Sequence, residues 1–532
     1  MMTVLRFPAM VLLAALLLTG WVGGAEKPGK AKAAGAAKPK AGKATGAAPK
    51  PAAGKPAKAE KPGVPAGAGG QPRVAWRPEY YRNRAYVPME QVAAYYGLKE
   101  PKESGKLVIL SDGEGKLRIE FTRGEKLVRI MGWAFYLSFP VVEVEGEVMV
   151  SVYDVRNVID AILHPGERRD PAQLQTVVID PAFGGLESGI RVAGLAEKDV
   201  ALDIGKRLAG KLEAAGFKVV MTRKDDSTVS LADREKVAAG VAGEAVFVSI
   251  RGNSGAAGVR GMETGTLPPA GTPATAEEDN DKVDRRFHAG NINDRESLAL
   301  AAVLQSSVIS TLKIPDLGIR RTRFAELRDI NLPAAVVRVG YLSHKEEGAR
   351  LATAEYRESL AENLLAGIRR YAQFLSYKLE ERLEEEKNRP LQFGEIRAEV
   401  TALDAGLAGE RILLHVPVRA APGVFVEREK VEVQLYLFER VDGEEIDLSA
   451  ANPPRDEWLS VLPDWKATRE EVLALTYLRP TFGQAEQKAY GKRTYFGYVA
   501  RLVYDGRVVD EAASPSNLKR CLFYFTAVFP RR

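Results

Sequence analysis

Cysteine and histidine are scarce in this chain of 532 residues, which contains a single cysteine, Cys521. One cysteine excludes an intrachain disulfide framework and any metal site built from several thiolates. The four histidines are far apart in the sequence, so no two form a local pair of metal ligands. These residues are His164, His288, His344 and His415. The histidines therefore do not indicate a local metal-binding motif.

A basic folded domain is also missing, although the formal net charge is +6. Residues 26–72 hold ten lysines against two glutamates, a charge of +8, and residues 1–25 add +1. The remaining 460 residues therefore carry −3. An acidic folded part argues against a nucleic-acid-binding domain, which would place a basic face on the fold itself.

Long apolar runs are absent beyond the N-terminus, where one short run stands between Met10 and Leu18. Arg6 precedes this run and small residues at 23–25 follow it. The order predicts a secretory signal peptide over residues 1–25, because the run is too short to span a bilayer. An uncleaved membrane anchor is the alternative. No cysteine follows the run, so a lipoprotein anchor is not indicated.

Residues 26–72 consist almost wholly of alanine, lysine, glycine and proline. With Val64 as the one large apolar side chain, this segment cannot offset the entropy of ordering and is predicted to be a disordered linker. Two interpretations remain open: a plain solvated linker, or a basic tether that touches an anionic polymer.

Residues 73–165 are predicted to form a small β-rich α+β domain. Short alternating segments predict strands, and two short helices are predicted over 88–96 and 152–162. The segment from Tyr86 to Gly97, YVPMEQVAAYYG, resembles the start of the copper amine oxidase N-terminal-like domain, which accompanies cell-wall enzymes in exported bacterial proteins. No set of copper ligands is visible, so no copper is inferred.

Residues 174–376 alternate apolar strands with amphipathic helices, which predicts a central α/β domain with a twisted, mostly parallel sheet between helix layers. A proline-rich and then acidic insertion at 265–293 is predicted to be a surface loop. Residues 377–392 read as a charged helical spacer. Residues 393–532 are predicted to form an all-β, sandwich-like domain, since alternating strands meet Asp-Gly turns.

The central segment resembles the zinc-dependent N-acetylmuramoyl-L-alanine amidase family of bacterial cell-wall hydrolases. The resemblance rests on several pieces in the family's order: VVIDPAFGG at 177–185, EKDVAL at 197–202, MTR at 221–223, LADR at 231–234, VSIRGNS at 248–254 and LPAAVVRVGYLS at 332–343. It implies the family's fold, a twisted sheet between helix layers.

The resemblance also implies a zinc ion held by two histidines and a glutamate, with a second glutamate acting on the zinc-bound water. Of those four positions only Glu197 keeps its residue type. The two histidine positions hold Phe183 and Arg251, and the late glutamate position holds Arg338. Phenylalanine has no lone pair to donate and arginine is a permanent cation, so we predict that zinc and the family chemistry are lost.

Two hypotheses describe the altered site. Arg251 is expected to replace the metal charge and to pair with Glu197, with Asp180 nearby. In the first hypothesis the charges form an internal salt-bridge cluster. In the second, Arg251, Arg338 and Asn253 line a cleft that binds a carboxylate, such as one on a peptidoglycan stem peptide. His288 and His344 are expected on surface loops, and the acidic stretch at 279–284 lacks the pattern of a calcium loop.

The sequence therefore predicts an exported pseudo-amidase of the periplasm or cell envelope that binds or scaffolds peptidoglycan or envelope proteins, without nucleic acid. One alternative is an active N-acetylmuramoyl-L-alanine amidase with a non-standard site. Another is a structural envelope protein with no affinity for glycan.

Overall fold

The structure is a computed structural model, and the part of the chain it describes begins at residue 78 and ends at residue 518. Within that range it leaves out residues 83, 114–116, 164–172, 276–283, 285, 388, 403–408, 443–444, 450–454, 461–464, 466–468, 481–482, 484–486, 488–490 and 516–517. The predicted signal peptide, the predicted linker, Cys521 and His164 lie outside the described residues. None of the described helices is long and apolar enough to cross a membrane.

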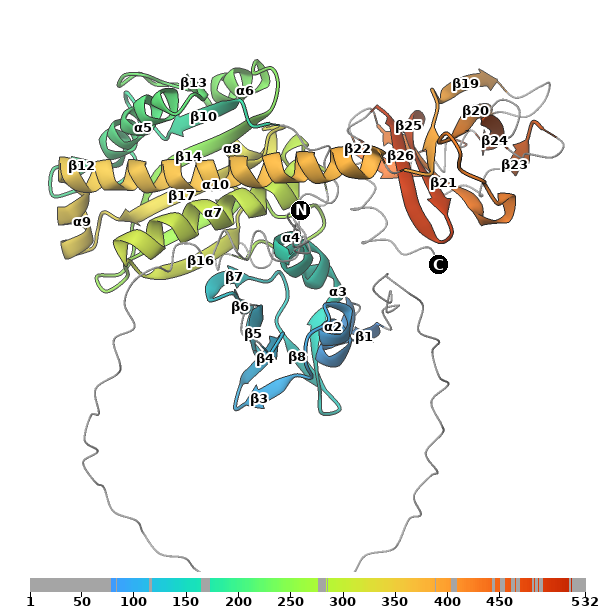
Figure 1. Cartoon of the computed structure of the whole chain (residues 1–532). Coiled ribbons are helices and arrows are strands. Elements are labelled where there is room, and N and C mark those ends of the chain that lie inside the picture. The colour runs from blue at the N-terminus through green and yellow to red at the C-terminus, as the bar shows by residue number, and fades with distance from the viewer. Residues whose placement is uncertain are drawn as a thin grey trace, which may run out of the picture.

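The N-terminal unit consists of two antiparallel sheets and short helices (Figure 1). Its elements are β1 (Glu79–Tyr81), β2 (Arg84–Pro88), α2 (Met89–Tyr95), β3 (Lys102–Ser104), β4 (Leu107–Ser111), β5 (Arg118–Thr122), β6 (Leu127–Ile130), β7 (Trp133–Tyr136), β8 (Val142–Val144), β9 (Glu147–Ser151), α3 (Val152–Asp154), η2 (Val155–Ile159) and α4 (Asp160–Leu163). The predicted helices lie within one or two residues of these bounds. One sheet has the order β1-β2-β9-β8, and β3 to β7 form a meander.

The central unit alternates strands and helices as the sequence predicts. Its elements are β10 (Thr176–Pro181), β11 (Arg191–Val192), β12 (Leu195–Ala196), α5 (Glu197–Ala214), β13 (Lys218–Met221), α6 (Leu231–Ala239), β14 (Ala245–Asn253), β15 (Met262–Thr266), η4 (Ala289–Asn293), α7 (Asp294–Leu312), β16 (Asp316–Arg321), α8 (Ala325–Arg328), β17 (Ala334–Tyr341), α9 (Lys345–Leu351) and α10 (Ala354–Lys387). Strands β13, β10, β14 and β17 are parallel, and β15 runs antiparallel to β17.

Helices cover both faces of this sheet, because successive residues of each strand point to opposite sides. On β10, Val177 and Ile179 pack in one core with apolar residues of α5, α7 and α10. Val178 faces the other way and packs with Ala238 of α6 and Leu327 of α8. The prediction of a sheet between helix layers is therefore confirmed for this unit.

The N-terminal and central units, which the sequence separates into two domains, share one sheet. Its order is β13-β10-β14-β17-β15-β16-β7-β6-β5-β4-β3, so the meander continues the central sheet at the edge strand β16. Phe135 of β7 is the register partner of Ile319 of β16. Beside it, the backbone N–H of Ala134 donates to a carboxylate oxygen of Asp316 at 2.9 Å.

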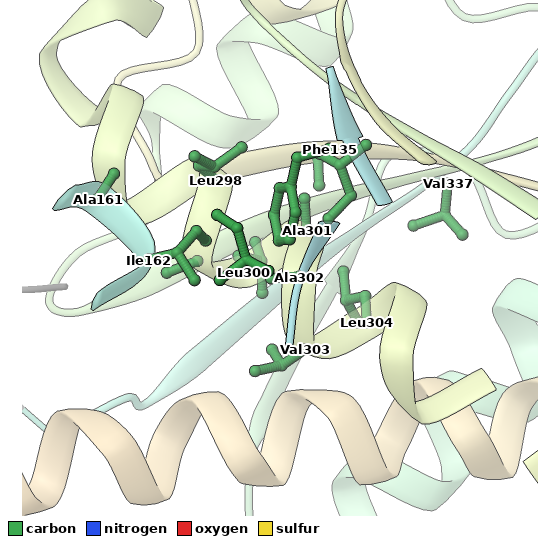
Figure 2. Close-up of a cluster of buried hydrophobic side chains, with 14 of the residues drawn as sticks. Phe135, Ala161, Ile162, Leu298, Leu300, Ala301, Ala302, Val303, Leu304 and Val337 are labelled. Atoms are coloured by element: carbon green, nitrogen blue, oxygen red, sulfur yellow. The ribbon is translucent and has the colours of Figure 1, made fainter. Parts of the chain in front are cut away.

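A common hydrophobic core lies behind this junction. Figure 2 shows Phe135, Ala161 and Ile162 of the N-terminal unit beside a run of α7 residues that begins at Leu298, and all of them are fully or almost fully buried. Helix α7 is buried along most of its length. It therefore has no polar face that would give an amphipathic pattern, and it was not predicted from the sequence. Since burial of apolar area drives folding, we infer that the two units fold as one body.

Helix α10 continues past residue 376, as the predicted spacer requires, and leads to the C-terminal strands (Figure 1). These elements are β18 (Leu391–Phe393), β19 (Arg397–Ala402), β20 (Gly409–Ala420), η5 (Arg428–Lys430), β21 (Val431–Val441), β22 (Glu445–Leu448), β23 (Arg455–Trp458), β24 (Glu470–Pro480), β25 (Arg493–Tyr504) and β26 (Arg507–Ser514). Strands β18, β20, β24 and β23, with β19 on β20, form one antiparallel sheet, and β22, β21, β25 and β26 form another. Leu414 and Leu475 of the first sheet share a core with Leu437 and Ala500 of the second.

Candidate functional site

The predicted site residues lie where three parallel strands end. Strands β10, β14 and β17 place their carboxyl ends at one edge of the sheet, which is where open α/β sheets bind ligands. Phe183 follows β10, Arg251 lies near the end of β14, and Arg338 lies near the end of β17. Glu197 opens α5, the helix that follows β10 after a short hairpin. The topology thus brings together the four positions that the family pattern singled out.

Glu197 is 2% exposed, and its carboxylate accepts two backbone N–H groups. These donors are Ile190 at 3.0 Å and Gly252 at 2.8 Å. Burial raises the pKa of the Glu197 carboxyl above its ordinary value. The two N–H donors, and then the charges on Arg251 and Arg338, lower that pKa in part.

Phe183 has a positive φ of 61°, a left-handed conformation that is unfavourable for a bulky side chain. Its carbonyl oxygen accepts a hydrogen bond of 2.7 Å from Arg234, which stabilises the turn. A Cβ on Gly189 would lie 2.7 Å from the Phe183 ring and 2.6 Å from a Glu197 oxygen. Glycine at 189 is therefore what lets Phe183 and Glu197 approach each other.

Arg251 does not form the predicted ion pair with Glu197. Its guanidinium group pairs with Glu326 of α8, with an Nη2–Oε1 distance of 2.5 Å. The oxygens of Glu197 instead accept the two backbone N–H groups. The Cζ atom of Arg251 also lies 5.0 Å from the ring centre of Phe183, close enough for a cation–π contact.

Arg338 is paired as well, with Glu263, its register neighbour on β15, at 2.7 Å. The other oxygen of Glu263 pairs with Arg320 of β16 at 2.8 Å. The Cζ atom of Arg320 stacks 3.8 Å from the ring centre of Tyr136, on strand β7 of the N-terminal unit. The row of charges therefore runs from the end of β17 to the junction between the two units.

Asp180 belongs to a different network. It is 1% exposed, forms an ion pair with Arg234, and accepts hydrogen bonds of 2.7 Å from the hydroxyls of Thr222 and Ser249. The structure thus gives Asp180 the partners Arg234, Thr222 and Ser249, and none of these contacts involves Arg251. Asp180 and Arg234, the arginine of the LADR segment, instead stabilise the end of β10. Arg223 of the MTR segment does the same, since it donates to the carbonyls of Pro181 and Ala182, both at 2.9 Å.

The remaining predicted residues have local roles. A side-chain oxygen of Asn253 accepts from the N–H of Ser254 at 2.9 Å, within its own turn. His344 caps α9, since its Nδ1 accepts from the N–H of Glu347 at 3.3 Å. His288 lies 2.9 Å from Asp284, the part of the acidic stretch that the structure describes.

The residue types at the four family positions do not fit a zinc ion. Phe183 offers no lone pair, and Arg251 carries a fixed positive charge that would repel a dication. Glu197 alone is a chemically suitable ligand, and both of its oxygens accept N–H groups. Among the described residues, no three histidine, cysteine, aspartate or glutamate side chains are grouped as a metal site.

Sequence reasoning missed the partners of the two arginines. Glu263, Glu326 and Arg320 come from segments outside the family pieces. Phe324, also outside them, has its ring centre 5.5 Å from the Cζ of Arg251 and 4.8 Å from that of Arg338. No local sequence signal indicates these partners, because they come from segments distant in the sequence.

Comparison with known proteins finds similarity to one family over the central unit. The family model described as N-acetylmuramoyl-L-alanine amidase matches residues 177–370. An uncharacterised protein, YqiI of Bacillus subtilis strain 168, is 29% identical over 203 residues, which are 38% of this chain and 87% of YqiI. The amidase AmiC of Neisseria meningitidis is 30% identical over 230 residues, 39% of this chain and 55% of AmiC. The amidase LytC of B. subtilis is 28% identical, but the match covers only 36% of LytC.

Two solved structures are similar to part of the chain. The amidase AmiC2 of Nostoc punctiforme is 34% identical, with 37% of this chain and 97% of that chain covered and a TM-score of 0.32. The amidase from Clostridium difficile 630 is 31% identical, with 39% and 98% covered and a TM-score of 0.31.

Proposed function

The chain belongs to the N-acetylmuramoyl-L-alanine amidase family through residues 177–370, and from that premise we propose that it is an exported pseudo-amidase. In this proposal the central unit recognises peptidoglycan at the cell envelope without cleaving it. The relatives LytC and AmiC are named as amidases of this class, which supports a cell-wall setting.

The observation that carries the proposal is the replacement of zinc ligands and base by Phe183, Arg251 and Arg338. Hydrolysis of an amide by this family needs a polarising metal and a group that accepts a proton near neutral pH. Arginine stays protonated and phenylalanine has no titratable group, so neither role can be filled at these positions. Glu197 is left without the ligands that would complete a zinc site.

The proposed recognition element is the pair Arg251 and Arg338, which has replaced the metal charge. Each guanidinium group is paired internally, yet about a quarter of each side chain is exposed. An arginine presents five N–H donors, so a guanidinium group that pairs with one carboxylate keeps donors for a second one. We propose that these remaining N–H donors contact the carboxylate of a stem peptide. Asn253, at the end of the strand that holds Arg251, would be a further polar contact.

The test is the zinc content and amidase activity of the purified protein. After dialysis at neutral pH, elemental mass spectrometry is expected to find zinc near zero per chain, and release of stem peptides from purified sacculi is expected to match the no-enzyme control. One zinc per chain together with peptide release would instead establish the alternative, an active amidase with a non-standard site. An active family member assayed in parallel serves as the positive control.

Co-sedimentation with purified sacculi separates binding from a purely structural role. The protein is expected to sediment with sacculi, and Arg251→Ala with Arg338→Ala is expected to weaken that binding. Binding that is unchanged in the double variant would remove the cleft from the proposal. A wild-type chain that stays in the supernatant would favour the structural envelope protein.

A further inference from the structure

The N-terminal unit contains a cavity of about 680 Å³ whose walls carry four cationic side chains. The cationic residues that line it are Arg82, Arg84, Lys106 and Arg123. Together with Tyr81, Tyr86 and Glu143 they come from β1, β2, β8 and the turns after β1, β3 and β5. The volume lies within the range of ordinary ligand sites.

Backbone hydrogen bonds fix the walls of this cavity. The N–H of Arg123 donates to the carbonyl of Lys106 at 2.8 Å, and the N–H of Gly124 donates to that of Val141 at 2.8 Å. Val141 in turn donates to the carbonyl of Glu125 at 3.0 Å. Three separate turns are thereby held in one arrangement before any ligand arrives, which lowers the entropy cost of binding.

The positive charges are only partly neutralised. Arg123 pairs with Glu103 and, at 3.3 Å, with Glu143. The other three cations have no carboxylate within ion-pair distance among the residues that the structure describes. Counting both glutamates against the four cations leaves an excess of two positive charges.

Aromatic rings orient the two unpaired arginines. The Cζ of Arg84 lies 4.1 Å from the ring centre of Phe139, and that of Arg82 lies 5.3 Å from the ring centre of Tyr81. A guanidinium group stacked on a ring keeps its in-plane N–H donors available. Stacked arginines with free edges are the arrangement that binds carboxylate or phosphate oxygens in a bidentate manner.

We propose that this cavity is a second binding site, separate from the family site, for the anionic groups of a cell-wall polymer. The choice of polymer rests on the proposed function, whereas the anion chemistry rests on the cavity itself. Two sources supply that chemistry in a bacterial wall: the carboxylates of stem peptides and the phosphates of attached polymers. The cavity differs from the family site in that three of its cations lack internal carboxylates.

The experiment is sedimentation of the full chain with purified Gram-positive sacculi, before and after chemical removal of their phosphate polymers. Arg84→Gln combined with Lys106→Gln is expected to weaken binding at least tenfold. The matched control is Lys99→Gln combined with Lys102→Gln, which removes two exposed charges of the same unit outside the cavity and is expected to change binding less than twofold. Arg84→Lys keeps the charge but lacks the planar guanidinium group, so its binding is expected to fall between that of the wild type and that of Arg84→Gln.

The two preparations identify the anion. If the cavity variant loses binding only to untreated sacculi, the bound anion is phosphate. If it loses binding equally to both preparations, the bound anion is carboxylate. The proposal is overturned if the cavity variant binds as the wild type does, if the control pair loses as much, or if the wild type sediments with neither preparation. Zinc content and amidase activity are separate readouts. An active, zinc-bound chain that still needs Arg84 and Lys106 would refute the pseudo-amidase and leave this site standing.

Discussion

Arg251 and Arg338 are register partners on the neighbouring parallel strands β14 and β17. Two cations placed side by side repel each other, so each needs its own compensation. Glu326 and Glu263 provide it, at 2.5 and 2.7 Å. The ring of Phe324 lies within cation–π distance of both guanidinium groups. Position 338, where the resemblance implies a glutamate that accepts a proton, thus holds an arginine within a cluster of paired charges.

Restoring the family glutamate alone is expected to destabilise the protein. In Arg338→Glu a carboxylate would face Glu263 across β15 and β17. The nearby cations Arg320 and Arg251 already pair with Glu263 and Glu326, so the new carboxylate would have no cation of its own. Breaking a largely buried pair costs several kcal/mol, and the quarter exposure of Arg338 reduces this to about 2 kcal/mol of unfolding free energy. Denaturation in urea measures the loss.

The matched control is Arg260→Glu, which breaks the exposed pair with Glu346. Its expected effect on the unfolding free energy is below about 1 kcal/mol, because exposed ion pairs contribute little. Equal losses in the two variants would show that the Arg338–Glu263 pair contributes no more to the unfolding free energy than an exposed ion pair does. Adding Glu263→Gln to Arg338→Glu is expected to recover part of the stability, since it removes the repulsion.

Zinc binding is expected to return when the two histidine positions are restored together. Phe183→His and Arg251→His would supply two imidazoles beside Glu197, the ligand set of the family. Histidine tolerates the left-handed φ of 61° at position 183 better than most bulky residues do. Elemental mass spectrometry is expected to find about one zinc per chain.

The control for this variant adds Glu197→Gln, which removes the one carboxylate and is expected to reduce the zinc content toward zero. A zinc-free double variant with a native-like melting temperature would mean that the strand ends no longer hold the ligand geometry. In that case the chain would share the fold of the family but not the ligand geometry of its zinc site.

The sequence predicts the place of a site residue when that residue belongs to one of the family segments, which occur in a fixed order along the chain. The family pieces predicted that the ends of β10, β14 and β17 meet, and they do. The partners Glu263 and Glu326 escaped prediction because ion pairs between distant segments leave no local pattern. Helix α7 was missed because it is buried on nearly every face and lacks an amphipathic period. The shared sheet was missed since edge pairing depends on two units meeting at β16 and β7.

Asp154 is expected to make stability depend on pH. It is fully buried, and its carboxylate accepts the N–H groups of Ser138 at 2.7 Å and Phe139 at 3.0 Å. Burial nevertheless raises the pKa of Asp154 from 3.8 to about 6. Between these values the native state binds more protons than the unfolded state, so the unfolding free energy falls as pH rises from about 4 to about 6.

The measurement compares the wild type with Asp154→Asn by urea denaturation across that range. Asparagine keeps one oxygen to accept an N–H group but cannot titrate. The wild type is expected to lose about 2 kcal/mol more than the variant between pH 4 and pH 6, and the two slopes should agree between pH 7.5 and 8.5. Identical slopes over the acidic range would contradict a raised pKa at this position.

Phe135→Ala is expected to destabilise the N-terminal and central units together, because its ring is fully buried in the core that they share. Removing such a ring typically costs about 3–5 kcal/mol. Calorimetry is expected to show one transition for both units, shifted to lower temperature. Hydrogen exchange should accelerate both in β7 and in α7.

The matched control is Leu414→Ala, which opens a cavity in the C-terminal core and should leave exchange in α7 unchanged. If α7 stayed protected in Phe135→Ala while β7 exchanged freely, the two units would be independent bodies that only touch at β16.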